Sequence, residues 1–532
     1  MKTRIFRIGL KDHFTWWELH AFFRTNIKFR FAALLLFLIG LLLSACTGGV
    51  SALPAATDLQ TGETATLTTP APPVASTTTT PEGQTSQPPS TESAGPTVPA
   101  PPSPLSEYDL TARLDYDAHH LSVNEEINYV NHTGEALNEL LLVVEPNHYP
   151  GGFSLGDLAW TGGETITDYT LEGAQLKIPL NAPLDSEASI ALSLSYETEI
   201  PNQQAPFGYS ERQTNLGDWY AFVPPYRPGE GWVARDSAYL GEHVAYEMAD
   251  FRVDIQLANP NNQAGQPLIV AASALPEIDG EHYRFQHGPA RNFAWTVSHL
   301  YQEQETRAGE VIVKAYSFPG HPASDEPAME TAAQALDVFS QIYSPYPHKS
   351  LTVVEADFLD GMEFDGMFFL SHAFYDYFTG DAKNNLIIIS AHETAHQWWY
   401  GLVGDDQALE PWLDEALSTY SEALFYERAH PDLKDWWWEN RIYFHQPQGW
   451  VDTTIYQAAG FYPYRDAVYL RGALFLQELR DRMGDEAFFG FLKDYLYHFM
   501  YGQATTDGFF NLLSEHYSGD ISDILQSYFS NR

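Results

Sequence analysis

Two hydrophobic patterns follow one another along the chain. From about residue 105 to 300, apolar and polar residues alternate, which is typical of β-strands with one buried face, and we expect these strands to pair in antiparallel fashion. The clearest examples are residues 108–116, 190–196 and 251–257. After about residue 325, apolar residues recur with the helical period, in residues 329–343, 386–402, 412–427 and 469–482. We therefore expect an α+β fold, with an antiparallel β-sandwich-like domain before a mostly helical domain.

The first 45 residues have the composition of a targeting segment. Residues 1–30 contain seven Lys or Arg and two acidic residues, and residues 31–43 form an apolar run of 13 residues that includes one glycine. Such a run is too short to span a bilayer comfortably and fits the core of a signal peptide. The sequence LSAC that ends at Cys46 is similar to a bacterial lipobox, in which the cysteine carries the lipid. We expect residues 1–45 to be a lipoprotein signal peptide and Cys46, the only cysteine, to anchor the protein to the outside of the bacterial cell membrane; the alternative is an uncleaved anchor.

The next segment is rich in Ser, Thr and Pro. These residues make up 31 of the 54 positions from 51 to 104, which include no Lys, Arg or aromatic residue. Such a segment buries too little apolar surface to offset its ordering entropy, so we expect residues 46–104 to be a disordered stalk. The rest of the chain exceeds what one hydrophobic core usually serves. We predict a β-domain over residues 105–305 and a helical domain over residues 306–532.

The chain is strongly acidic, with a formal net charge of −42 at pH 7. Without residues 1–45, it keeps 21 basic and 68 acidic residues. A surface of this sign repels a phosphate backbone, which argues against nucleic-acid binding. It fits a soluble protein outside the cell and would attract cationic peptides.

An H-E-x-x-H motif, HETAH, occupies residues 392–396. Residues four apart share a helix face, so His392 and His396 can direct their imidazoles at one ion. Glu415 lies 19 residues after His396, beside the apolar face of the next predicted helix, where an unpaired carboxylate would be costly. Two imidazoles and one carboxylate suit catalytic zinc, with the fourth position open to water. We predict one Zn²⁺ per chain, bound by these three residues, with Glu393 as the base that takes a proton from the water.

The helical context argues against an accidental match, which is the alternative interpretation. The predicted helix 386–402 is entered through Asn384 and left through Gly401 and Gly404. The next helix is predicted to start at Pro411, because proline is favoured in the first turn.

The motif and its surroundings resemble the membrane-alanyl-aminopeptidase family of gluzincin zinc peptidases, which includes aminopeptidase N and leukotriene-A4 hydrolase. Residues 392–401, HETAHQWWYG, are close to the family's H-E-x-x-H-x-W-aromatic-G pattern, and residues 412–416 read WLDEA where the family usually has WLNEG. Residues 290–295 (ARNFAW) are similar to the end of the family's N-terminal β-domain, and residues 346–355 (YPHKSLTVVE) to the start of its catalytic core. The resemblance implies a β-domain followed by a thermolysin-like catalytic domain.

The resemblance also implies two further site residues. Tyr469 lies in YLRGA, which matches the family's Y-x-K-G-A segment, where the tyrosine stabilises the oxyanion of the transition state. Glu363 lies in DGMEF, which aligns with the family's G-x-M-E-N, where the glutamate binds the free α-amine of the substrate. Asp360 and Phe364 depart from that segment, so Glu363 has the alternative of a structural carboxylate, and Tyr469 that of a packing aromatic residue.

The sequence thus predicts a zinc metallopeptidase, specifically an aminopeptidase that hydrolyses peptides at the extracytoplasmic face of the membrane. Zinc would polarise the water and the scissile carbonyl, Glu393 would pass the proton to the leaving amine, and Tyr469 with the metal would hold the oxyanion. The full-length family continues into C-terminal domains that cover the site, so the end of this chain at Arg532 predicts a more open site. The alternatives are a gluzincin endopeptidase with an open cleft and a non-catalytic surface module with structural zinc. The sequence does not indicate an oligomeric state.

Overall fold

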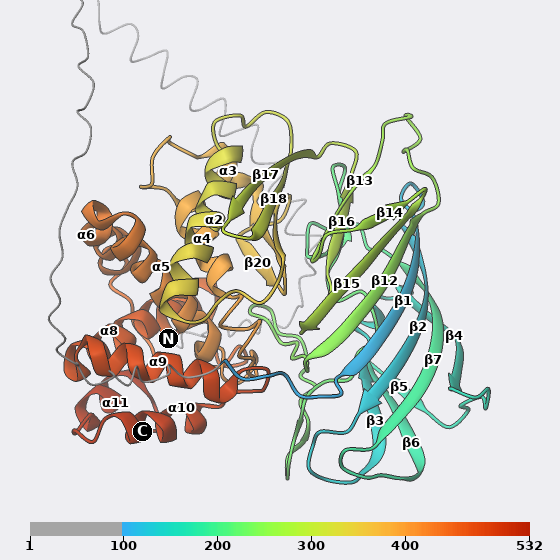
Figure 1. The fold of residues 1–532 in the computed structure, drawn as a ribbon, viewed down its shortest axis with the longest axis horizontal. Helices are drawn as coiled ribbons and strands as arrows, with labels where there is room; N and C mark the ends of the chain where they lie inside the picture. The colour runs from blue at the N-terminus through green and yellow to red at the C-terminus, as the bar shows by residue number, and fades with distance from the viewer. Residues whose placement is uncertain (1–97) are drawn as a thin grey trace, which may run out of the picture. The chain divides into compact units, whose positions relative to one another are not determined.

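The computed structural model describes residues 98–532. The expected signal peptide, Cys46 and the expected stalk up to residue 97 lie outside the described residues. Within residues 98–532, every helix is too short or too polar to span a lipid bilayer. This part of the chain is an α+β protein in which a β-rich part precedes a mainly helical part, as the sequence predicts (Figure 1).

A seven-stranded sheet is the largest element of the β-domain, and its long strands run side by side in Figure 1. In spatial order its strands are β14 (Glu277–Asp279), β15 (His282–Ala290), β12 (Ala249–Leu257), β1 (Ser106–Asp115), β2 (His120–Val130), β7 (Ser189–Glu199) and β4 (Phe153–Trp160). Leu110 and Leu114 on β1 share one hydrophobic core with Leu140 and Ile178 of a smaller sheet. The core therefore lies between sheets, as in a sandwich.

Three smaller sheets complete the β-domain. One contains β3 (Leu137–Val143), β6 (Gln175–Leu184) and β5 (Thr170–Glu172). Another contains β13 (Ile269–Ala272), β16 (Trp295–Ser298), β9 (Thr214–Leu216) and β8 (Phe207–Tyr209). The last pairs β10 (Tyr226–Arg227) with β11 (Gly231–Trp232), and a short helix, η1 (Glu145–His148), follows β3.

The direction of one strand pair differs from the prediction. β1 pairs with β2 in antiparallel fashion, with Tyr108 opposite Ile127, but it pairs with β12 in parallel, with Tyr108 opposite Phe251. The expectation of purely antiparallel pairing is therefore wrong at this point. Alternation reports which face of a strand is buried, and it is the same for either strand direction. The rings of Tyr108 and Phe251 stack on the buried face, with centroids 5.2 Å apart.

The second part of the chain is built on a five-stranded sheet covered by helices. In spatial order its strands are β17 (Gln302–Ala308), β18 (Val311–Ser317), β19 (Ser350–Ala356), β21 (Met367–Ser371) and β20 (Gly361–Phe364). Helices α2 (Asp325–Ile342), α4 (Asn385–Ala395) and α5 (Trp412–Ala429) pack on one another, and α2 and α4 also contact the sheet. The expected boundary between residues 305 and 306 falls inside β17. Strands β17 and β18 and helix α2 belong to this layer and precede residues 346–355 in the chain.

The remaining helices follow along the chain. They are α3 (His372–Asp376), η2 (Pro431–Leu433), α6 (Lys434–Trp437), η3 (Trp438–Ile442), η4 (Tyr443–His445), α7 (Phe461–Arg465), η5 (Asp466–Leu470), α8 (Arg471–Met483), α9 (Asp485–Phe499), α10 (Thr506–His516) and α11 (Ser522–Tyr528). Helix α5 begins at Trp412, one residue after the expected Pro411. Tyr469 was predicted to open a helix, but it lies in the π-helical turn η5 that precedes α8.

The helix that carries the HETAH motif is shorter than predicted. Asn384 caps the start of α4, but the helix ends at Ala395 rather than at residue 402. Tyr400 has a φ of 124°, which interrupts any helix. The backbone carbonyls of Tyr400 and Leu402 accept hydrogen bonds from the Arg291 guanidinium, at 2.5 and 3.1 Å, instead of from helical N–H groups. A buried arginine from the β-domain therefore fixes the chain just beyond the motif.

Candidate metal centre and catalytic cleft

Helices α4 and α5 bring three donor atoms around one point. His392 and His396 lie at the C-terminal end of α4, and Glu415 lies in the first turn of α5. The Nε2 atoms of the imidazoles are 3.1 Å apart, and Oε2 of Glu415 lies 3.2 Å from Nε2 of His392 and 3.5 Å from Nε2 of His396. A tetrahedral zinc site with bonds of about 2.0–2.1 Å has donor–donor edges of about 3.3 Å. The three predicted ligands are buried and spaced as a zinc ion requires.

Further contacts orient both imidazoles. Nδ1 of His392 lies 2.9 Å from Oε1 of Glu422, and Arg441 donates hydrogen bonds to both oxygens of that carboxylate, at 2.8 and 2.9 Å. Burial raises the pKa of Glu422, but Arg441 and His392 outweigh burial and hold it below its usual value. Nδ1 of His396 lies 3.0 Å from the backbone oxygen of Trp399. With each Nδ1 engaged in this way, each Nε2 is directed at the candidate ion.

Glu393 lies next to the three donors and lines the same cleft. Burial raises the pKa of Glu393 to about 8, against the lowering by His392 and His396. A pKa near neutrality suits a group that takes up and releases a proton. Its Oε2 is buried and has no hydrogen-bond partner within residues 98–532, so it can accept one from a water molecule. The backbone of β20 passes close by: a Cβ at Gly361 would lie 2.0 Å from Oε1 of Glu393, so a larger residue there would displace the Glu393 carboxylate.

Tyr469 contacts the carboxylate of the metal centre. Its hydroxyl donates a hydrogen bond to Oε1 of Glu415, and its ring stacks on that of His392, with centroids 5.9 Å apart and planes 14° apart. Burial and the charge of Glu415 hold the pKa of Tyr469 well above its usual value. The hydroxyl therefore keeps its proton at neutral pH and can donate a hydrogen bond to an oxyanion.

Glu363 lies on β20, and its buried carboxylate faces the cleft. The side-chain amide of Gln407 donates hydrogen bonds to Oε1 of Glu363 and to Oδ2 of Asp414, both at 2.9 Å. Phe364 belongs instead to a small hydrophobic core shared with the β-domain, as alternation along a strand requires. Phe364, which stands where the family segment has asparagine, therefore does not displace Glu363 from the cleft. Asp360 adopts a left-handed conformation, with a φ of 69°, at the start of this segment.

The predicted residues line one cleft of about 430 Å³ to which both domains contribute. Glu242, from the segment that precedes β12, adds a carboxylate from the β-domain. Burial and the charges of Glu363 and Glu415 hold the pKa of Glu242 well above its usual value. Leu359 and Phe461 also line the cleft and are 84% and 46% exposed. An acidic interior with an exposed apolar rim suits a ligand with an ammonium group and apolar side chains.

Sequence reasoning missed Glu422, Gln407 and Glu242. Glu422 stands two helical turns after Glu415 on the same face of α5, so its spacing from that residue was the available signal. Gln407 and Glu242 lie outside named helices and strands, where no periodic pattern marks a buried face. Their approach to the cleft is a tertiary contact that the sequence alone does not show.

Comparison with known proteins assigns the second part of the chain to a family. Residues 327–528 match the Peptidase family M1 domain. Aminopeptidase M1-B from Oryza sativa subsp. japonica is 25% identical over 292 residues, which cover 49% of this chain and 32% of that protein. Aminopeptidase N from Lactobacillus helveticus is 26% identical over 284 residues, which cover 49% and 34%. Aminopeptidase N from Canis lupus familiaris is 26% identical over 377 residues, which cover 63% and 36%. The chain spans about a third of the length of these relatives.

Solved structures show the same fold. The M1 zinc metallopeptidase from Deinococcus radiodurans aligns with a TM-score of 0.57 at 19% identity, over 80% of this chain and 92% of that chain. A mutant of that enzyme bound to the substrate Tyr-Ser-Ala aligns with a TM-score of 0.57 at 20% identity, over 79% and 93%. Residues 327–528 form a peptidase family M1 domain, and the chain is similar to aminopeptidases N and to an M1 zinc metallopeptidase. The roles of its individual site residues stay predictions.

Proposed function

We propose that the protein is a zinc-dependent metallopeptidase that acts as an aminopeptidase. The observation that carries the proposal is the buried triangle of His392, His396 and Glu415, with Glu393 and Tyr469 facing the same cleft. A Zn²⁺ ion held by the triangle supplies a Lewis acid that polarises a water molecule and the scissile carbonyl.

The neighbouring side chains supply the proton transfers and the oxyanion contact. Glu393, with its pKa raised to about 8 by burial, accepts a proton from the attacking water and delivers it to the leaving amine. Tyr469 donates a hydrogen bond from its hydroxyl to the developing oxyanion, in place of the bond that it makes to Glu415. Both groups therefore act more strongly in the transition state than in the ground state.

Aminopeptidase character rests on Glu363. A buried carboxylate beside the reacting centre binds the α-ammonium of a substrate through a charge-assisted hydrogen bond. Glu242 lines the same cleft and adds to its acidity. The β20 strand supports this role, because Glu363 faces the cleft while Phe364 packs away from it. A substrate anchored in this way presents its first peptide bond to the metal centre.

The test compares a leucyl fluorogenic amide with its N-acetylated form. The purified protein should cleave the free-amine form about 10- to 100-fold faster, because acetylation removes a charge-assisted hydrogen bond. Equal cleavage of the two substrates would contradict the aminopeptidase proposal and support an endopeptidase instead. Cleavage of neither, by protein that holds its zinc, would support a non-catalytic surface module.

We also propose that the protein acts on peptides outside the cell while anchored to the membrane by lipid at Cys46. The LSAC sequence after an apolar run supports this, although it lies outside the described residues. The acidic composition fits a soluble extracytoplasmic domain. In cells fed a labelled fatty acid, the wild type should carry label and Cys46→Ser should accumulate as an unlabelled precursor. Label on the variant, or none on the wild type, would favour an uncleaved anchor.

A further inference from the structure

Three side chains of the metal-binding type converge outside the cleft, where the β-domain contacts the catalytic domain. His287 lies on β15, His348 lies shortly before β19, and Asp365 lies in the turn between β20 and β21. Nε2 of His348 lies 2.6 Å from Oδ1 of Asp365, and Nε2 of His287 lies 3.6 Å from the same oxygen. Nε2 of His287 also lies 3.1 Å from the backbone carbonyl oxygen of Asp365. Two imidazoles from different domains thus direct the same ring nitrogen at one carboxylate.

The surrounding backbone holds the carboxylate in this orientation. Oδ2 of Asp365 accepts a hydrogen bond of 2.9 Å from the backbone N–H of Arg291. The backbone N–H of Asp365 donates a hydrogen bond of 3.0 Å to Oδ1 of Asn292. His287 and Asp365 are buried, at 5% and 2% exposure. Oδ1 of Asp365 is therefore fixed toward the two imidazoles by groups that do not compete for it.

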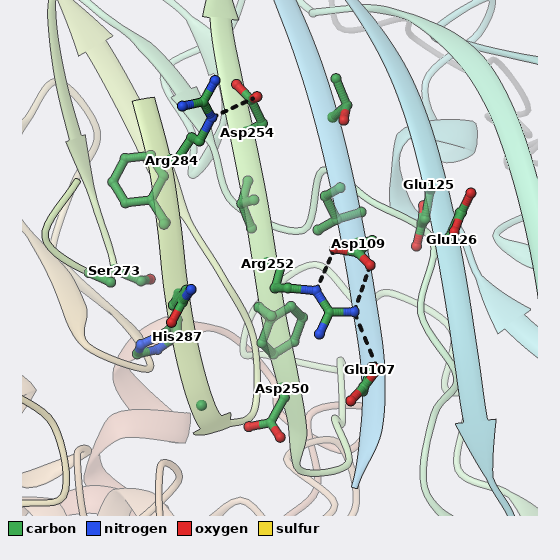
Figure 2. A pocket seen from close by; sticks show the side chains of 18 of the residues that line it. Glu107, Asp109, Glu125, Glu126, Asp250, Arg252, Asp254, Ser273, Arg284 and His287 are labelled. Atoms are coloured by element: carbon green, nitrogen blue, oxygen red, sulfur yellow. Dashed lines mark hydrogen bonds and ion pairs between the residues drawn. The ribbon is translucent and has the colours of Figure 1, made fainter. Parts of the chain in front are cut away.

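The cluster has a path to solvent. His287 and His348 line a cavity of about 1370 Å³ that follows the polar face of the seven-stranded sheet. Figure 2 shows His287 on β15 in this cavity, with Arg252 and Asp109 paired on the neighbouring strands. A hydrated ion can reach the two imidazoles through this cavity without opening the fold, and water can complete its coordination.

The donor set equals that of the candidate catalytic centre. Each group offers two imidazoles and one carboxylate, with donor atoms that lie within 4.8 Å of one another. This set suits Zn²⁺ and similar transition-metal ions. A simple ion pair needs only one histidine, because the single charge of Asp365 neutralises one imidazolium. His287 is buried and reaches the same carboxylate from the β-domain, so it can add a second imidazole ligand to an ion there.

We propose that His287, His348 and Asp365 form a second site for a divalent transition-metal ion of the zinc class. The 2.6 Å contact is shorter than a donor–donor edge around zinc, and the proton shared there occupies the place of the ion. An ion takes this place only when both imidazoles turn an unprotonated Nε2 toward it, with the ring proton of each on Nδ1. Because Asp365 stands two residues after Glu363, the ion braces the turn that follows the cleft residue.

Metal analysis of the zinc-loaded, gel-filtered protein tests the site. The wild type should hold about two zinc ions per chain, and His348→Ala and His396→Ala should each hold about one. The double variant should hold none. His282→Ala is the matched control, since His282 lies on the same strand and pairs with Asp254 instead, and it should keep both ions.

Two outcomes overturn the proposal. One is a single zinc in the wild type and none in His396→Ala. The other is a second zinc that remains in the double variant, because that ion must then be bound elsewhere.

Circular dichroism checks that His348→Ala folds. Asp365→Asn supplies an independent test, since the amide keeps an acceptor for the Arg291 N–H but is a weaker ligand. If Asp365→Asn keeps the second ion, Asp365 is not a ligand and the proposed second site is wrong. Peptide hydrolysis by protein that holds only one zinc ion would still support the proposed peptidase function.

Discussion

Tyr469 and Glu415 share a hydrogen bond that links the candidate oxyanion donor to the candidate metal ligand. The Tyr469 hydroxyl donates to Oε1 of Glu415, while the other oxygen of that carboxylate, Oε2, faces His392 and His396 at 3.2 and 3.5 Å. The Tyr469 hydroxyl is therefore connected to the position of the ion through the Glu415 carboxylate. It needs only to exchange this partner for the oxyanion of a substrate.

Tyr469→Phe should lower kcat by about 10²- to 10³-fold, because one preorganised oxyanion donor is lost. KM should change little, since the contact is strongest in the transition state. Steady-state kinetics on the leucyl amide measure both constants, and zinc content should be unchanged. A variant with normal kcat would show that Tyr469 only packs against His392.

His396→Ala should remove the catalytic zinc and abolish hydrolysis, because it takes away one of three protein ligands. Zinc content and activity are measured on the same preparation. His516→Ala, which removes a partly buried histidine that pairs with Asp494 far from the motif in sequence, is the control and should keep both zinc and activity. Undiminished zinc in His396→Ala would mean that the ligands are misassigned.

Glu363→Ala should slow cleavage of the free-amine substrate by about 10- to 100-fold, the worth of a charge-assisted hydrogen bond of about 1.5–3 kcal/mol. The same substitution should have little further effect on the N-acetylated substrate, because acetylation already removes the contact. The four kcat/KM values form a double-mutant cycle. Equal losses on both substrates would make Glu363 a structural carboxylate.

Glu125 should make the stability of the β-domain depend on pH. It is buried, with Oε2 accepting hydrogen bonds from the Tyr196 hydroxyl and the Ala221 N–H, and burial raises its pKa to about 8 from 4.5. The folded chain keeps a proton that the unfolded chain releases, so this contribution is complete below pH 4.5 and is lost as the pH rises to about 8.

Glu125→Gln should remove this dependence, which amounts to at most about 1.4 kcal/mol per pH unit. Urea unfolding at about pH 5 and about pH 8 gives the free energy of unfolding at each pH. The difference between the two values should be smaller in Glu125→Gln than in the wild type. The exposed neighbour Glu126 supplies the control, since Glu126→Gln should leave the difference unchanged. An unchanged pH dependence in Glu125→Gln would mean that Glu125 is ionised in the folded protein.

Local pattern predicted the elements but not their tertiary partners. Periodicity placed β1, β7, β12, α2 and α5 within a few residues, because burial on one face is a local property of the sequence. It missed the parallel pairing of β1 with β12, since alternation is the same for either direction. It also extended α4 to residue 402, whereas the backbone carbonyls of residues 400 and 402 accept hydrogen bonds from the Arg291 guanidinium instead of continuing the helix.

In the candidate site too, the sequence indicated some of the residues, and only the folded chain shows the others. The spacing of HETAH and Glu415 was sufficient to bring three donors together, because a helix fixes residues four apart on one face. The structure places Glu363 and Tyr469, which only the family resemblance indicated, in the same cleft. Gln407 and Glu242 reach the cleft from loops, and only the folded chain shows them.

Glu393→Gln tests the central claim most directly, because it changes the proposed base and none of the proposed ligands. Zinc content and hydrolysis of the leucyl amide are measured on the variant and the wild type side by side. We predict unchanged zinc and a rate that is lower by about 10²- to 10⁴-fold, as expected for the loss of a general base. Wild-type activity in the zinc-loaded Glu393→Gln variant would contradict the account.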